Sequence, residues 1–167
     1  MKKSFFAILF LSATFIGITS FNTKSGNEPG NYAHNFKFVS KTDSTSLSTV
    51  LSTTEAEYIL INFWSSSDAA SRLKGKNYQI SLNQWDMMDK VTYFSINLDQ
   101  NIKLGNEIAM IDHLDSLTLA RSETKIENVR NLYGMKHHLK SFLLNDKGEI
   151  VSVNPLPEEI NRFINKR

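Results

Sequence analysis

The run Tyr58–Trp64 (YILINFW) constrains the fold most, because every side chain in it except Asn62 is apolar or aromatic. A strand with one face in water alternates apolar and polar residues, so this run suits a strand covered on both faces. The four residues that follow, SSSD at 65–68, are types that cap helix N-termini. The sequence therefore predicts a buried strand that leads directly into a helix.

The rest of the chain reads as alternating helices and strands. We expect a short strand or hairpin around 36–54, helices at Asp68 to about Lys90 (with a break at Gly75 left open), Ile102–Leu114, Lys125–Tyr133 and from Pro157, and strands at Val91–Asn97, Ser141–Leu144 and Glu149–Val153. A strand–helix–strand unit needs a right-handed crossover and parallel pairing, whereas a terminal hairpin pairs antiparallel. The order predicts an α/β fold, with a mixed sheet of four or five strands and helices on both faces.

Composition narrows the functions open to the chain. Its 167 residues are 41% hydrophobic, which suits one domain with a real core. The net charge of +2 excludes a strongly basic nucleic-acid-binding protein. The absence of cysteine excludes disulfides, thiolate metal sites, cysteine nucleophiles and a lipidated N-terminal cysteine.

No motif in the sequence indicates a cofactor or a metal ion. Phosphate-binding loops and dinucleotide glycine fingerprints are absent. His137 and His138 are adjacent, but neighbouring residues of a strand point to opposite faces, and no third ligand is evident. We expect no cofactor, no metal and no catalytic residue.

The N-terminus has the order of a secretory signal. Lys2 and Lys3 precede an uncharged, mostly apolar run that ends near the small residues Thr19 and Ser20. The run is shorter than the ~20 residues needed to span a membrane, so residues 1–21 are predicted to be a signal peptide, with a retained N-terminal anchor as the alternative. Residues 22–31, with Gly, Pro and Asn, read as a linker to a domain at 32–167. We expect a periplasmic or secreted protein, or one anchored in the membrane and facing the periplasm.

Two segments resemble signatures of the thioredoxin-like thiol-disulfide oxidoreductases of the bacterial cell envelope. Residues 60–67 (LINFWSSS) are similar to the stretch that precedes the Cys-x-x-Cys motif of that family. Residues 139–150 (LKSFLLNDKGEI) are similar to its second signature, a cis-proline followed by a strand, a tight turn with glycine and a returning strand. The resemblance covers about residues 30–165 and implies a thioredoxin-like domain.

The departures from that family bear on function. Asp68 and Ser71 stand at the two cysteine positions, and Leu139 stands at the cis-proline position. The family's chemistry needs a thiolate that attacks a disulfide and a second thiol that resolves the mixed disulfide. Neither Asp nor Ser does this, so we expect that the chain is not a thiol-disulfide oxidoreductase on its own. A cis bond before a non-proline residue costs ~2.5–4 kcal/mol, so the bond at Leu139 is expected to be trans.

Asp68 has two interpretations. A carboxylate at a helix N-terminus accepts hydrogen bonds from free N–H groups and so caps the helix, and the alternative is a contact with a ligand or partner. Trp64, Asp68 and Leu139 together form the candidate binding face that the resemblance implies. We expect a non-catalytic binding or scaffold protein with a protein or peptide partner, no nucleic acid, and membrane contact only through an uncleaved N-terminus. The alternative is an accessory of thiol–disulfide homeostasis that acts with a thiol-bearing partner.

Overall fold

The computed structural model describes residues 24–40, 43–87, 89–114 and 119–166, so the predicted signal at 1–21 lies outside the described residues. The strands are β1 (Ser25–Gly26), β2 (Tyr32–Ala33), β3 (Lys37–Ser40), β4 (Asp43–Ser46), β5 (Tyr58–Trp64), β6 (Val91–Asn97), β7 (Leu119–Ser122), β8 (Ser141–Asn145) and β9 (Ile150–Val153). The helices are α1 (Leu47–Thr53), α2 (Ala69–Gln84), α3 (Ile102–Ile111), α4 (Ile126–Leu132) and α5 (Pro157–Ile164). None of these helices is long and apolar enough to cross a membrane.

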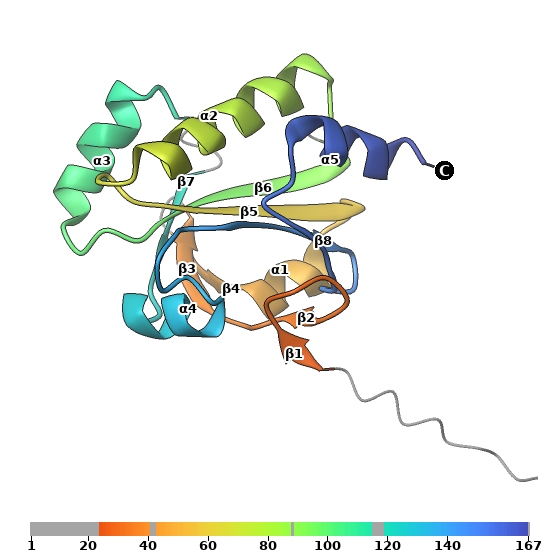
Figure 1. Cartoon of the computed structure of the whole chain (residues 1–167), viewed down its shortest axis with the longest axis horizontal. Coiled ribbons are helices and arrows are strands. Elements are labelled where there is room, and N and C mark those ends of the chain that lie inside the picture. The colour runs from red at the N-terminus through yellow and green to blue at the C-terminus, as the bar shows by residue number, and fades with distance from the viewer. Residues whose placement is uncertain (1–23, 41–42, 88, 115–118, 167) are drawn as a thin grey trace, which may run out of the picture.

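Seven of the strands form one mixed sheet in the order β4-β3-β7-β6-β5-β8-β9 (Figure 1). The pairs β5–β6 and β6–β7 are parallel, and the remaining pairs are antiparallel. The predicted mixed α/β architecture is confirmed, but the sheet is wider than the expected four or five strands. The extra width comes from β4 and β7, which have 4 residues each and are too short to show a clear alternating pattern, whereas β3 lies in the region where a short strand or hairpin was expected.

Helices cover both faces of the sheet, as expected. α2, α3 and α5 lie on one face, and α1 and α4 lie on the other (Figure 1). Side chains of β5 enter both cores: Ile59, Ile61 and Phe63 pack on the α1/α4 side, and Leu60 packs on the α2/α5 side. Burial on both faces explains why the β5 sequence is apolar at successive positions.

Helix α2 is shorter than expected and unbroken. It ends at Gln84 instead of Lys90, since the chain turns at Trp85 and Asp86. Asp86 has a positive φ of +52°, which is incompatible with a continuing helix. It also runs through Gly75 without a break. A Cβ atom at Gly75 would lie 2.8 Å from Asn62 Nδ2, so the glycine allows α2 to pack closely on β5 instead of interrupting the helix.

Two other segments also differ from the expectation. The Ser/Thr-rich region at 36–54 begins with the expected hairpin, β3–β4, but it continues as a helix, α1, whose N-cap Ser46 accepts a hydrogen bond from the Thr49 N–H. Part of the segment that reads as a linker contacts the domain: Gly30 N donates to the Ile150 carbonyl at 2.9 Å, and Ile150 N donates to the Asn31 carbonyl at 2.8 Å.

Candidate functional site

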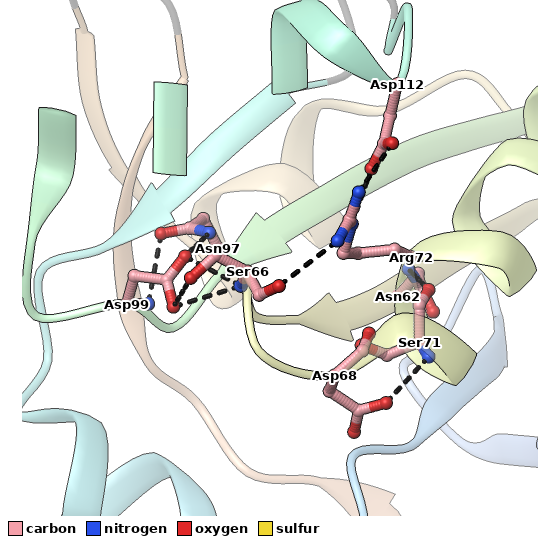
Figure 2. Close-up of polar contacts among 8 residues, drawn as sticks. All are labelled: Asn62, Ser66, Asp68, Ser71, Arg72, Asn97, Asp99 and Asp112. Atoms are coloured by element: carbon pink, nitrogen blue, oxygen red, sulfur yellow. Dashed lines mark hydrogen bonds and ion pairs between the residues drawn. The ribbon is translucent and has the colours of Figure 1, made fainter. Parts of the chain in front are cut away.

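The candidate site lies where β5 and β6 end and α2 begins (Figure 2). Asp68 is the N-cap of α2, and its Oδ1 accepts a hydrogen bond of 3.0 Å from the Ser71 N–H. Ser71 Oγ donates in return to the Asp68 carbonyl at 2.9 Å. The expected capping role of Asp68 is therefore confirmed. The carboxylate occupies the electropositive end of the helix, where a reactive thiolate would gain its stabilisation.

Replacing Asp68 by alanine is expected to lower the free energy of unfolding by ~0.5–2 kcal/mol, because the Ser71 N–H loses its acceptor. Denaturant midpoints measure the effect. Asp68→Asn is the matched control, since asparagine caps about as well as aspartate and leaves the midpoint near that of the wild type. An unchanged midpoint for Asp68→Ala would show that the carboxylate is not a structural cap.

The loop before α2 is fixed by a carboxylate from the neighbouring strand. Asp99, just beyond β6, accepts the Ser66 N–H through Oδ1 at 3.1 Å and Oδ2 at 2.9 Å, and it also accepts the Ser66 hydroxyl. Asn97 orients this carboxylate, because its Nδ2 donates to Asp99 Oδ2 at 2.8 Å and its Oδ1 accepts the Asp99 N–H. The carboxyl ends of β5 and β6 are thus joined in a fixed geometry.

A bidentate ion pair ties the start of α2 to the end of α3. Arg72 Nε lies 2.6 Å from Asp112 Oδ2, and Arg72 Nη2 donates to Asp112 Oδ1 at 2.7 Å. Arg72 Nη1 also donates to the Ser66 carbonyl, so one guanidinium fixes both the loop and the helix (Figure 2). The hydrogen bonds from Arg72 lower the pKa of Asp112, and those to Asp112 raise the pKa of Arg72. The Asp112 side chain is only 18% exposed, so the ion pair is partly shielded from solvent.

Because the pKa of Asp112 is lowered in the folded protein, the stabilisation that this ion pair provides depends on pH. The stabilisation is complete at a pH above about 3.9, the ordinary pKa of an aspartate in the unfolded chain. It is lost as the pH falls through the lowered pKa that Asp112 has in the folded protein. Asp112→Asn is expected to cost about 1–2 kcal/mol at neutral pH and almost nothing at about pH 2. Urea midpoints of both proteins across this range test it; a difference that does not change with pH would contradict it.

A groove of about 370 Å³ opens beside the fixed loop. Its walls are Ser65, Ser67, Leu98, Asp99, Gln100, Ile126, Glu127 and Arg130. Hydroxyl, amide and charged groups of both signs thus surround two aliphatic side chains. This mixture suits the amide groups and small side chains of a peptide segment.

The structure does not bring the three residues of the predicted binding face onto one exposed surface. Trp64 is 1% exposed on the α2/α3 side of the sheet, and Leu139 is 8% exposed and packs in the core on the α1/α4 side. Asp68 is half-buried at the start of α2. No peptide bond in the described residues is cis, so the trans bond expected at Leu139 is confirmed.

The other candidate ligands do not gather into a site. His137 and His138 are both exposed. Within the described ranges, no three His, Asp or Glu side chains are grouped so that they could hold a metal ion. Sequence reasoning missed the roles of Asp99 and Asp112, since each meets its partner through the fold and not through a local motif.

Comparison with known proteins agrees with the fold described above. No protein-family model matches the sequence, and no curated protein matches it. Among solved structures, a thioredoxin-like protein from Parabacteroides distasonis superposes with a TM-score of 0.68 at 27% identity, over 84% of this chain and 97% of that chain. The chain has a thioredoxin-like fold.

Two further thioredoxin-like structures carry redox names. The thioredoxin domain of a thiol-disulfide oxidoreductase from Bacteroides vulgatus matches with a TM-score of 0.71 at 17% identity, over 82% of this chain and 98% of that chain. A putative thiol:disulfide interchange protein DsbE from Chlorobium tepidum matches with a TM-score of 0.66 at 18% identity, over 84% of this chain and 96% of that chain. This thioredoxin-like chain is similar to them in fold, but it contains no cysteine.

Proposed function

We propose that this thioredoxin-like protein is exported to the cell envelope and binds a segment of another protein there without redox chemistry of its own. The observation that carries the proposal is the start of α2, where Asp68 caps the helix in a chain without cysteine. A permanent carboxylate occupies the position that thiol chemistry requires, while the surrounding fold is complete.

The groove beside the loop is the proposed binding site. The Ser66 contacts with Asp99 and Arg72 hold one wall in place, so that little ordering is needed when a peptide binds. Glu127 and Arg130 of α4 add one charge of each sign to the lining of the groove. This arrangement favours a peptide with polar backbone contacts and small side chains over a large apolar partner.

Site-specific photo-crosslinking tests this proposal. A photoreactive residue at Ser67, which is exposed in the groove, should give a discrete protein adduct in the cell envelope. The matched control is the same residue at Asp146, which is exposed in the turn between β8 and β9. Arg130→Glu should reduce the adduct at Ser67. Equal adducts at both positions, or no adduct at Ser67, would contradict the proposed site.

The similarity to a structure named as a thiol:disulfide interchange protein favours a second candidate, an accessory that acts with a thiol-bearing partner. The protein captured in the Ser67 adduct distinguishes this accessory role from simple binding. Trapping of free thiols by alkylation, followed by mass spectrometry, identifies whether the captured protein carries a redox-active cysteine pair. A partner without such a pair supports the binding function alone.

Export predicts a mature N-terminus between about Ser20 and Gly30. The order of positive, apolar and small residues at 1–21 supports this placement. N-terminal sequencing of the protein from the periplasmic fraction measures it. An intact Met1 in the membrane fraction would favour the retained anchor and would contradict cleavage.

A further inference from the structure

A second cleft, of about 270 Å³, lies on the α2/α3 side of the sheet and is separate from the groove. Helix α3 forms one wall through Ile102 and Gly105, and the sheet contributes Trp64 from β5 and Asn97 from β6. Arg121 of β7 also lines the cleft. The cleft therefore joins an apolar wall to a few convergent polar groups, as small-molecule sites do.

The wall of the cleft is rigid where α3 meets the sheet. A Cβ atom at Gly105 would lie 2.8 Å from Asn97 Oδ1, so the glycine brings the helix directly onto this amide. Both ends of the Asn97 amide are already engaged by Asp99, which fixes its orientation. The shape of the cleft at this point does not depend on a mobile side chain.

Two residues that line the cleft carry polar groups without a protein partner in the described part of the chain. Trp64 is 1% exposed, and its indole Nε1 makes no hydrogen bond within the described residues. An indole N–H is a donor only, and a buried donor without an acceptor is unfavourable. Arg121 makes no ion pair with any carboxylate in the described part of the chain. The Trp64 nitrogen is enclosed by protein atoms, so the group open to a ligand is the half-buried Arg121 guanidinium, which pairs best with a negatively charged acceptor.

We propose that this cleft binds a small organic carboxylate with a short aliphatic body. The carboxylate pairs with the Arg121 guanidinium, and the ligand lies beside Trp64, whose indole resonance reports its presence. The aliphatic body packs against Ile102 and against Val39 of β3, which also lines the cleft. The site differs from the peptide groove in position and in ligand class, so it stands or falls independently of the proposed function.

The indole N–H provides a direct readout in the full chain. The sequence has two tryptophans, so a Trp85→Phe variant assigns the remaining indole resonance to Trp64. The probe is 4-methyl-2-oxopentanoate, which carries a carboxylate, a keto oxygen and a branched aliphatic body. Titration should shift the Trp64 indole resonance saturably. The neutral amide of the same acid, 4-methyl-2-oxopentanamide, is the matched ligand control and should bind at least about tenfold more weakly.

Variants of the arginine complete the test. Arg121→Gln should weaken binding of the oxo acid at least about tenfold, whereas Arg121→Lys should retain much of it, because the charge remains. Arg162→Gln on α5, an exposed arginine away from the cleft, should leave binding unchanged. The dispersion of the amide spectrum shows that each variant is folded. No saturable shift of the indole, equal binding of the amide, or unchanged binding by a folded Arg121→Gln protein would overturn the proposal.

Discussion

The double variant Asp68→Cys with Ser71→Cys is expected to form an intramolecular disulfide and to reduce insulin with dithiothreitol, whereas the wild type does not exceed the dithiothreitol background. Position 68 is the N-cap of α2, where free N–H groups and the helix dipole lower the pKa of a thiol. Ser71 Oγ already lies 2.9 Å from the Asp68 carbonyl oxygen, so the second thiol is placed close to the first.

The two single variants are the controls for this result. With one thiol, a mixed disulfide forms and cannot be resolved within the protein, so neither single variant should turn over. Activity of the double variant should stay below that of an oxidoreductase with a full substrate site, because Leu139 packs inward and is buried. Activity of the wild type would overturn the non-redox assignment, and a double variant that cannot close its disulfide would contradict the placement of these positions on α2.

The elements that local patterns specify were predictable from the sequence. Strand β5 can be recognised in the sequence as an apolar run, because both of its faces are buried. The N-cap of α2 and the Pro157 start of α5 follow from capping chemistry and from the fixed φ of proline. The β8–β9 hairpin follows from its turn, in which Gly148 adopts a φ of +82°.

The elements that depend on tertiary contacts were not predictable in this way. Strand β7 has 4 residues and is a strand because β6 and β3 pair with it on either side. Helix α1 lies in a Ser/Thr-rich region of low helix propensity, and its buried residue Leu47 packs into the core below the sheet. In both cases packing outweighs local preference.

The same reasoning applies to the candidate site. The sequence placed Asp68 correctly because its partner Ser71 is three residues away. The partner of Arg72 is 40 residues away, and that of Ser66 is 33 residues away, so no local pattern contains them. Trp64 was a candidate for an exposed face, but the side-chain alternation of β5 turns it inward beneath α3.

Tyr133→Ala is expected to be the most destabilising single substitution proposed here, with a loss of about 3–5 kcal/mol in the free energy of unfolding. Tyr133 follows α4 and is fully buried. Its ring lies 5.0 Å from Phe63, 5.0 Å from Phe142 and 5.7 Å from Phe36, measured between ring centroids. Truncation leaves a cavity at the centre of this aromatic cluster, which cannot close because Phe63 of β5 and Phe142 of β8 are held in place by the sheet.

Tyr133→Phe separates the packing term from the hydrogen bond. The phenol donates to the His34 carbonyl, and burial raises its pKa, so the hydroxyl remains a neutral donor. Removing it should cost only about 1 kcal/mol, since the ring and its contacts stay in place. Urea unfolding measures the free energy of unfolding of both variants, provided that its dependence on urea concentration is the same for the two proteins. A Tyr133→Ala protein that loses no more stability than Tyr133→Phe would show that the cluster does not hold the α1/α4 side of the sheet together, because the ring would then contribute nothing beyond its hydroxyl.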